Sequence, residues 1–242
     1  MLKREIIYYT DNLPDKKFLT VIQRQILRAC GGIPIISVSQ KPIDFGRNIV
    51  MEGIGRSNLS IFRQILAGLE ASDADIVFFC EHDVIYHPSH FDFVPPDNTA
   101  YWYDRNVWKV RTSDGQAVYY RTSGLSLMTC YRDIAVEHYR ERVEKQTDGT
   151  LPRGTGHEPG HHLHPVGLGT IPAKYFTSKH PCIDIRHKNN KTQHDRFRIE
   201  TFKSQKSCRE WHLSDEVPFW GKTKGRFNEF LEDVSHGRIS II

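Results

Sequence analysis

The sequence predicts an α/β fold in which a mostly parallel central sheet is flanked by helices. Over residues 5–80, short apolar runs typical of strands alternate with amphipathic runs typical of helices. The run Asp75–Cys80 is apolar on both faces, as a strand covered by helices on both sides would be. At 242 residues the chain can bury one substantial core. We expect residues 1–195 to form the main domain and residues 196–242 an irregular C-terminal extension packed on it.

The N-terminal half is predicted to run strand, helix, strand, helix, strand. The strands are expected at Glu5–Thr10, Ile33–Val38 and Asp75–Cys80. The helices are expected at Phe18–Cys30 and Asn58–Ala71, where apolar residues recur at helical spacing. This alternation is the pattern of a doubly wound α/β sheet.

Beyond residue 95 the pattern is less regular and richer in aromatic residues. The predicted elements are strands at Tyr101–Val110 and Gln116–Arg121 joined as a hairpin by Ser113-Asp114-Gly115, a strand at Leu125–Cys130, a helix at Tyr131–Lys145 and a loop over residues 154–169.

The bulk properties indicate a soluble, cytoplasmic protein. No run approaches the roughly 20 apolar residues of a membrane span, and the N-terminus lacks the apolar core of a signal peptide. The five cysteines are scattered and never in CxxC spacing, which favours reduced thiols over a disulfide framework or a zinc ribbon.

The sharpest local feature is Glu81-His82-Asp83, which directly follows the buried run Asp75–Cys80. In open α/β sheets, ligands bind outside the carboxyl ends of the strands. Carboxylates placed there can hold a divalent cation, Mn²⁺ or Mg²⁺, against phosphate oxygens. The alternative is that these acidic side chains are only exposed to water at the end of a strand and bind no ligand.

A strand followed by a DxD-like motif is the pattern of the GT-A glycosyltransferases. The chain resembles these enzymes, in particular those like glycosyltransferase family 2. The resemblance implies a metal ion and a nucleotide-sugar donor, expected to be a UDP-sugar. By this resemblance, Asp83 would bind the metal ion, and Glu81 would lie beside the donor's ribose or in the metal shell. Glu81 departs from the family pattern, which has Asp at this position.

The order of further segments extends the resemblance over residues 5–190. At the end of the first strand, Thr10 and Asp11 stand where the family binds the nucleotide base and ribose. Arg47 and Arg63 precede the DxD-like strand, as donor-contacting residues do in the family. Ser123-Gly124 stands where an acceptor-side loop is expected.

His157-Glu158-Pro159-Gly160-His161 matches the HExxH pattern of zinc proteases, but we do not expect it to act as one. That motif requires both histidines on one face of a helix. Pro159 lies between them, and proline inside a helix costs about 3 kcal/mol or more.

Glu158 fits the resemblance better, as the general base of an inverting glycosyltransferase. In that family a carboxylate of an xED-like motif lies near a helix start, and Pro159 suits the first helical position. The usual following Asp is absent here. The alternative is that Glu158 only caps a helix N-terminus.

A late histidine often returns to the metal in GT-A enzymes, and His187 stands at the matching position, with His180 as the second candidate. Lys188 and Asn189 are then expected to contact the donor phosphates. Imidazole, carboxylate and phosphate oxygens together suit Mn²⁺ or Mg²⁺.

The sequence thus favours an inverting, metal-dependent glycosyltransferase that acts on an acceptor hydroxyl. A nucleotidyltransferase is the alternative enzyme. The non-catalytic alternative is a nucleic-acid-binding module built on residues 174–209, with ten Lys or Arg against three Asp or Glu. The family resemblance offers a precedent for such a basic segment, because small GT-A-like enzymes glycosylate hydroxymethylated bases in viral DNA. It therefore suggests a hydroxymethylated base in DNA as the acceptor, with a cell-surface polysaccharide precursor or a protein as the alternatives. The sequence does not indicate an oligomeric state.

Overall fold

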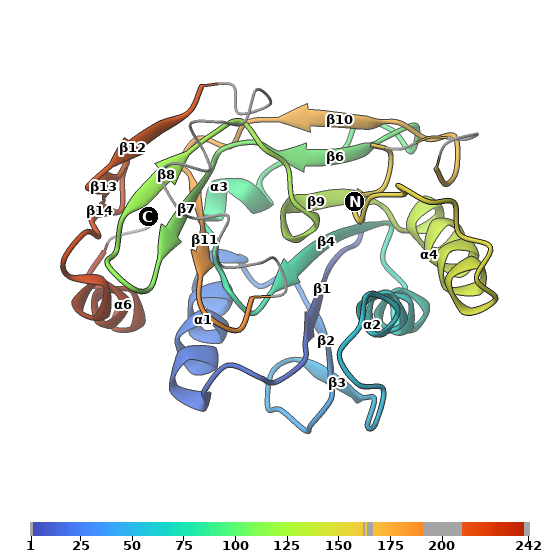
Figure 1. Ribbon diagram of the computed structural model, residues 1–242, viewed down its shortest axis with the longest axis horizontal. Coiled ribbons are helices and arrows are strands. Elements are labelled where there is room, and N and C mark those ends of the chain that lie inside the picture. Colours follow the sequence, from blue (N-terminus) through green and yellow to red (C-terminus); the bar gives the residue numbers. More distant parts are fainter. Residues whose placement is uncertain (1, 162, 164–166, 191–209, 240–242) are drawn as a thin grey trace.

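The computed structural model describes residues 2–161, 163, 167–190 and 210–239. Within this part a seven-stranded sheet forms the centre, in the order β10-β6-β9-β4-β1-β2-β3 (Figure 1). Only β9 runs antiparallel to its neighbours β4 and β6, and every other described pairing in this sheet is parallel. The strands are β1 (Arg4–Thr10), β2 (Ile35–Ser39), β3 (Arg47–Val50), β4 (Ile76–Glu81), β6 (Tyr101–Asp104), β9 (Met128–Tyr131) and β10 (Ala173–Phe176).

Helices cover both faces of this sheet, and alternate residues of β1 and β4 point to opposite sides (Figure 1). On one side, Ile6 and Phe78 pack in a core with α1 (Lys16–Ala29). On the other, Ile7 and Phe79 pack in a core with α2 (Asn58–Ala71) and α4 (Arg132–Thr147). Because β1 and β4 are buried on both faces, apolar residues fill them and polar residues gather at their ends.

A second sheet lies beside the first in the order β12-β8-β7-β11-β5. Its strands are β5 (Val84–Ile85), β7 (Val107–Arg111), β8 (Ala117–Tyr119), β11 (Cys182–Arg186) and β12 (His212–Ser214). The chain passes from the first sheet to the second between β4 and β5, so the Glu81-His82-Asp83 turn connects the two sheets. The short helices are α3 (Pro88–Phe91) and η1 (Leu125–Leu127).

The described part of the C-terminal region packs on the second sheet and on α1. It contains β12, a hairpin of β13 (Glu216–Val217) and β14 (Gly221–Lys222), and helix α6 (Phe227–Ser235). Arg28 of α1 donates hydrogen bonds to the carbonyls of Val234 and Ser235. The proposed boundary at residue 195 lies outside the described residues, so the domain division stays a prediction.

The predicted fold class is confirmed, and the helix over Asn58–Ala71 has the predicted bounds. The predicted hairpin is confirmed as the antiparallel pair β7 and β8. The expected single strand Tyr101–Val110 is instead two strands in different sheets. The reason is local: Asp104 Oδ1 accepts a hydrogen bond from the backbone N–H of Asn106 at 2.9 Å, which turns the chain between β6 and β7.

The structure also bears on membrane spans and on the state of the cysteines. None of the described helices is long and apolar enough to cross a membrane. The described cysteines, at positions 30, 80, 130 and 182, are free and buried, as expected for reduced thiols.

Gly68 allows α2 to lie close to the sheet, and its replacement gives a test of this packing. A Cβ at this position would lie 2.7 Å from Cγ2 of Ile7, which is fully buried. Gly68→Ala should therefore lower the free energy of unfolding by about 1–3 kcal/mol, although alanine favours helix formation. Urea unfolding measures the difference. A variant as stable as the parent protein would show that Ile7 moves aside freely.

Candidate functional site

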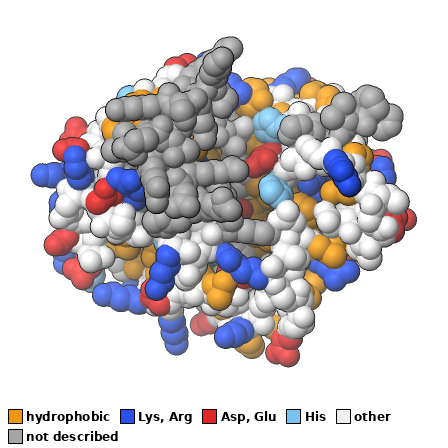
Figure 2. Space-filling view, in the orientation of Figure 1, with side chains coloured by type: hydrophobic (Ala, Val, Ile, Leu, Met, Phe, Trp, Pro, Cys, Tyr) orange, Lys and Arg blue, Asp and Glu red, His pale blue; other side chains and the backbone are white. Residues whose placement is uncertain are grey.

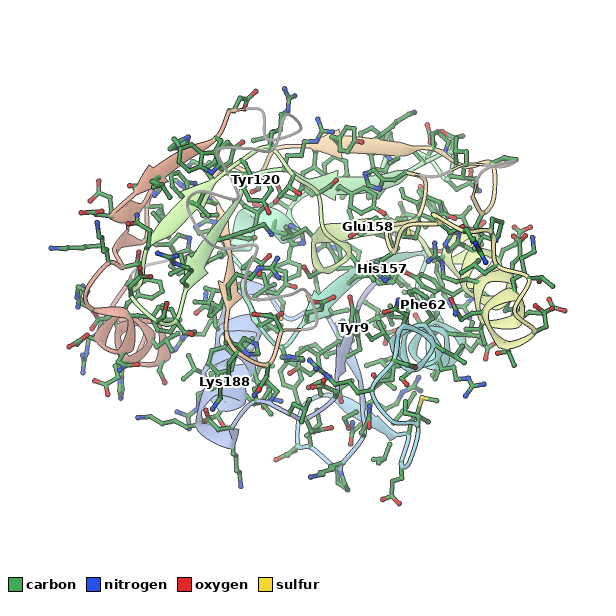
Figure 3. All side chains as sticks on the ribbon, viewed as in Figure 1. Tyr9, Phe62, Tyr120, His157, Glu158 and Lys188 are labelled. Carbon is green, nitrogen blue, oxygen red and sulfur yellow. The ribbon has the colours of Figure 1, made fainter. Side chains whose placement is uncertain are left out.

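Polar side chains gather where β1 and β4 end, at one edge of the central sheet. The two strands are parallel neighbours with Tyr9 opposite Glu81, so their following residues meet at that edge. A cavity of about 80 Å³ opens there. It is lined by Tyr9, Thr10, Asp11, Gln40, Gly55, Arg56, Ser57, Ser60, Ile61, Gln64, Glu81, His82, Asp83, Asn189 and Asn190. We call it the strand-end cavity. On the face drawn in Figure 2, histidine and acidic side chains lie beside one another near the centre, in the region where Figure 3 labels His157 and Glu158 above Tyr9.

Glu81 lies at the back of this cavity in a largely apolar setting. The hydroxyl of Tyr9 donates a hydrogen bond to Glu81 Oε1 at 2.5 Å, and Tyr86 Oη accepts one from the Glu81 N–H at 3.1 Å. Burial, followed by the nearby charge of Asp83, raises the pKa of Glu81 to about 8. The Glu81 carboxyl is therefore protonated at neutral pH and can itself donate a hydrogen bond.

Asp83 has the opposite character, although its side chain is also buried. Asn190 Nδ2 donates to Asp83 Oδ2 at 2.6 Å, and the N–H of Ile185 donates to the Asp83 carbonyl at 2.8 Å. Burial by itself would raise the pKa of Asp83, but the interactions with His187, His82 and Arg186 outweigh it. They lower the pKa to about 2, so Asp83 is a carboxylate at neutral pH.

The ligating atoms of His82, Asp83 and His187 lie within 4.8 Å of one another, and Nε2 of His187 is 3.7 Å from Asp83 Oδ2. Nδ1 of His187 accepts a hydrogen bond from the Asn189 N–H at 3.2 Å, which leaves the proton of a neutral imidazole on Nε2. Nε2 could bind a cation only after this contact is lost and the proton moves to Nδ1. A carboxylate with two imidazoles fits a divalent cation, and fits Mn²⁺ better than Mg²⁺, which prefers oxygen ligands.

The structure separates the two histidine candidates. His187 follows β11 and lies beside Asp83, whereas His180 packs against His87 and Phe219, with ring centroids 4.6 and 4.5 Å apart. Neither His87 nor His180 lines the strand-end cavity.

The other predicted donor-binding residues fall into two groups. Thr10, Asp11 and Asn189 line the strand-end cavity. Lys188 is exposed and lines a different, larger cavity. Arg47 does not reach the site, because its guanidinium donates to the carbonyl of Ala71 at the C-terminal end of α2. Arg63, also on α2, is not among the lining residues either.

Three residues of the site were missed by sequence reasoning. Arg56 donates to Asp11 Oδ2 at 2.9 Å and to the Asn189 carbonyl, so it joins two sides of the cavity. Asn190 bonds Asp83 from the end of β11. No role was predicted for His82. The strand ends at Glu81 and the chain turns there, which brings His82 beside His187, with ring centroids 6.2 Å apart.

A second group of potential metal ligands lies in the core, away from the cavity. His90, Asp104 and Cys182 are fully buried, and His90 Nδ1 lies 3.0 Å from Asp104 Oδ2. Asp104 Oδ1 also accepts from the N–H groups of Asn106 and Ser178. Hydrogen bonding within the fold therefore accounts for this carboxylate.

Glu158 does not begin a helix, so the expected helix start is a correction. Residues 148–161 form turns and bends. Gly160 has φ +82°, and a Cβ there would lie 2.5 Å from the backbone nitrogen of Ala173, so the chain cannot continue as a helix through this point. The helix-cap alternative for Glu158 is excluded for the same reason, and His157 and His161 do not share a helix face.

The loop carrying Glu158 is nevertheless held in one place. Tyr103 Oη donates to the Pro159 carbonyl at 2.7 Å, and Arg142 Nη1 donates to the Gly156 carbonyl at 2.8 Å. His161 Nε2 lies 3.1 Å from Ser123 Oγ, so this loop contacts the predicted acceptor-side loop. Figure 3 shows His157 and Glu158 on the same side of the molecule as Phe62 and Tyr9.

The Glu158 loop also lies near the buried ring of Tyr139 on α4. Burial raises the pKa of Tyr139 above its ordinary value, and the charge of Glu158 adds to this rise.

Arg142 lies beneath the Glu158 loop and is only 2% exposed. Its Nε donates to His138 Nε2 at 3.0 Å, and its guanidinium carbon lies 4.7 Å from the Phe62 ring centre. His138 must be neutral to accept this bond. Burial, and then the charge of Arg142, lower the pKa of His138 to about 3.

Comparisons with known proteins give a limited result. No protein-family model matches the chain, and no curated protein matches it. Among solved structures, the chain is similar to a glycosyltransferase involved in the glycosylation of the major capsid of PBCV-1. The two sequences are 9% identical, and the TM-score is 0.44. The match covers 72% of this chain and 81% of that chain. It is also similar to a mycobacterial protein, with 13% identity and a TM-score of 0.32. This match covers 46% of this chain and 42% of that chain. Because both scores are low, the functional inference rests on the side chains of the site.

The neutral His138 predicts how stability changes with pH. Its pKa is about 3 in the folded protein and 6.5 in its ordinary state, so between these values the unfolded chain binds more protons. Stability should therefore fall as the pH falls through this window, by up to about 1.4 kcal/mol per pH unit from this group. Urea unfolding from pH 7 to pH 4 should show a shallower loss for His138→Gln. Parallel curves for the two proteins would contradict a neutral, buried His138.

Proposed function

We propose that this protein is a metal-dependent glycosyltransferase that moves a sugar from a nucleoside-diphosphate sugar to an acceptor hydroxyl. The observation that carries the proposal is the cluster of His82, Asp83 and His187 at the carboxyl end of β4. His82 and Asp83 line the strand-end cavity together with Thr10 and Asp11, and His187 lies beside them on the turn after β11. Ligands of open α/β sheets bind at this edge, and a nucleotide diphosphate needs both a polar cavity and positive charge there.

The lining residues have suitable chemistry for the nucleotide part of the donor. Asp11 and Arg56 form an ion pair at the rim, and Gln64 donates to the Thr10 carbonyl at 2.8 Å, which fixes the cavity wall. The protonated Glu81 carboxyl can donate a hydrogen bond to a ribose hydroxyl. This role suits Glu81 better than metal binding, because a neutral carboxyl is a poor ligand.

Asp83, with His82 and His187, would hold the divalent cation. When bound, such a cation neutralises the negative charge that develops on a departing diphosphate. Asp83 suits this role because its low pKa keeps it ionised at neutral pH. The two imidazoles make Mn²⁺ the expected ion. Lys188 and Asn189, on the turn after β11, stay proposed as donor-phosphate contacts.

Glu158 is proposed as the general base. As the acceptor oxygen attacks the anomeric carbon, its proton passes to the Glu158 carboxylate, and the bond between that carbon and the phosphate oxygen breaks with its electron pair going to the nucleoside diphosphate. Attack from the face opposite the leaving group inverts the configuration. Tyr103 and Arg142 hold the loop that carries this base.

The alternatives make different products or need different residues. A nucleotidyltransferase would use the same strand-end carboxylates but release pyrophosphate. A nucleic-acid-binding module, or a DNA acceptor with hydroxymethylated bases, depends on the basic segment 174–209, of which residues 191–209 lie outside the described residues. The DNA acceptor stays a prediction from the sequence, and here the acceptor is specified only as a hydroxyl.

Asp83→Asn should abolish both Mn²⁺-dependent donor hydrolysis and transfer, because the amide lacks the negative charge that holds the cation. The measurement is nucleoside diphosphate release from a panel of nucleotide sugars, together with Mn²⁺ titration by electron paramagnetic resonance. Asp44→Asn, at an exposed position, is the matched control. Full activity of Asp83→Asn, or of the parent protein in excess chelator, would refute the metal-dependent mechanism.

Glu158→Gln should lower transfer by about 10²- to 10⁴-fold while leaving Mn²⁺ binding intact, because the amide cannot accept the proton. Glu144→Gln, an exposed change on α4, should keep full activity. Nuclear magnetic resonance of the product should show inverted anomeric configuration. Retained configuration, or an unchanged rate for Glu158→Gln, would remove Glu158 from the role of base.

A further inference from the structure

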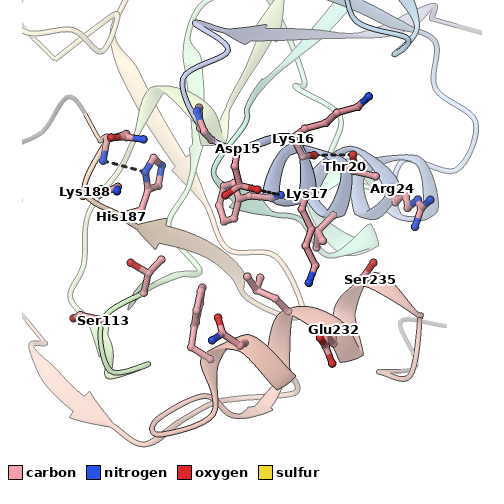
Figure 4. Close-up of a pocket in the computed structure, with 18 of the residues that line it drawn as sticks. Asp15, Lys16, Lys17, Thr20, Arg24, Ser113, His187, Lys188, Glu232 and Ser235 are labelled. Atoms are coloured by element: carbon pink, nitrogen blue, oxygen red, sulfur yellow. Dashed lines mark hydrogen bonds between the residues drawn. The ribbon is translucent and has the colours of Figure 1, made fainter.

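A second cavity lies between α1 and α6, on the far side of the turn that carries His187 (Figure 4). Its volume is about 1180 Å³, above the usual range of about 300–1,000 Å³ for small-molecule sites. Arg28 joins the two helices near the end of α6 through the carbonyls of Val234 and Ser235. His187, Lys188 and Asn189 line this second cavity, and Asn189 also lines the strand-end cavity. We call the second space the interhelix cavity.

The interhelix cavity is rich in positive charge. Lys17 and Arg24 are two turns apart on α1, so both lie on the face that lines the cavity with Val21. Lys16 and Lys188 line it as well, and all four cationic side chains belong to exposed residues. Figure 4 shows the Lys17 side chain extending into the space between α1 and α6.

These cations are poorly balanced by the protein itself. The carboxylates among the described lining residues are Asp15 and Glu232. Asp15 already accepts a hydrogen bond from the Phe18 N–H at 2.9 Å as the N-cap of α1. Among the described residues, no ion pair is formed by Lys16, Lys17, Arg24 or Lys188. Four cations therefore face two carboxylates across one space, and they repel one another when the cavity holds only water.

The position of Lys16 and Lys17 makes this arrangement less favourable still. Both lie in the first turn of α1, where the positive end of the helix dipole favours anionic side chains and disfavours cations. None of the residues in this turn, which the structure describes completely, is acidic. A bound anion would offset both the dipole and the mutual repulsion of the lysines.

The cavity wall is not only cationic. Pro14, Phe18, Val21, Phe227 and Leu231 give it an apolar side along α1 and α6. A wall with apolar and aromatic patches between hydrogen-bonding and cationic groups suits a ligand with a ring or apolar body and anionic groups. Inorganic anions alone would leave the apolar part of the space filled only by water.

We propose that the interhelix cavity binds a phosphorylated small molecule with a ring-shaped body, at a site separate from the strand-end cavity. Lys17 and Arg24 bind phosphate on the α1 side, and Phe18 and Phe227 contact the ring. Lys188 also lines this cavity, but binding here does not require it, because it is proposed as a donor-phosphate contact. The proposal goes beyond glycosyl transfer, because it concerns binding and does not require activity at the strand-end cavity.

The test is calorimetric titration with fructose 1,6-bisphosphate and glucose 6-phosphate, with glucose as the uncharged control. The titrations use the full chain in chelator and low salt, so that metal-dependent binding at the strand-end cavity does not contribute. Both phosphorylated probes should bind, the bisphosphate more tightly, and glucose should not bind. Lys17→Ala/Arg24→Ala should weaken binding by roughly tenfold or more per cation removed, because each charge-assisted bond contributes about 1.5–3 kcal/mol.

Two further variants make the test specific. Lys222→Ala/Lys224→Ala removes the same charge from the β14 region, outside the interhelix cavity, and should leave binding unchanged. Lys17→Gln/Arg24→Gln keeps polar side chains and should lose binding without a lower melting temperature, since the lysine disfavoured by the helix dipole is gone. Asp83→Asn should bind both probes like the parent protein.

Three outcomes would overturn the proposal. One is the absence of saturable binding of both phosphorylated probes at millimolar concentration. Another is an unchanged affinity in Lys17→Ala/Arg24→Ala. The last is loss of binding in Asp83→Asn, which would place the probes in the strand-end cavity. Loss of transfer in Asp83→Asn with probe binding retained would instead support both proposals separately.

Discussion

The parallel pairing of β1 with β4 is the constraint on which the rest of the site depends. Both strands are covered by helices on both faces, so their interiors accept only apolar side chains, and polar residues can appear only where the strands end. Because the register sets Tyr9 opposite Glu81, the residues that follow meet at one edge of the sheet. The Tyr9–Glu81 hydrogen bond closes the back of the strand-end cavity. A shift of one residue in this register would turn Glu81 into the core, at the cost of burying a carboxyl among apolar side chains.

The passage of the chain from one sheet to the other gives the two carboxyls of the Glu81-His82-Asp83 turn different properties. Glu81 is still part of β4 and lies against Tyr9, where burial raises its pKa to about 8. Asp83 directly precedes β5, and the pairing of β5 with β11 brings His187 and Asn190 beside it. Burial would raise its pKa, but His187, His82 and Arg186 lower it to about 2. One turn thus supplies a neutral carboxyl and an ionised carboxylate. The environments of Glu81 and Asp83, rather than their chemical types, give them different pKa values.

Long-range contacts also position the third carboxyl group. The Glu158 loop is held by Tyr103 from β6 and by the buried Arg142 from α4, whose own contact with His138 keeps that imidazole neutral. Buried hydrogen-bonded groups of this kind cost stability when one partner is removed, because the remaining partner loses its bond away from water. The loop can therefore be fixed in place without secondary structure of its own. The same turn that carries His187 separates the strand-end cavity from the interhelix cavity, so the two proposed binding sites share one wall.

The sequence by itself determined the α/β class, the bounds of α2 and the strand-end turn with Asp83, because these depend on periodicity and on the local switch from apolar to acidic residues. The resemblance to a family made His187 the first candidate metal ligand and His180 the second, but the sequence could not show which of them lies beside Asp83. That choice depends on the pairing of β11 with β5, between residues about a hundred positions apart. The places of Arg47, Arg56 and Asn190 were decided only by the tertiary structure, since a long side chain can reach in any direction until its neighbours are fixed. Glu158 shows the same limit: its sequence suggested a helix start, but Gly160 packs so tightly against Ala173 that the chain must turn there instead.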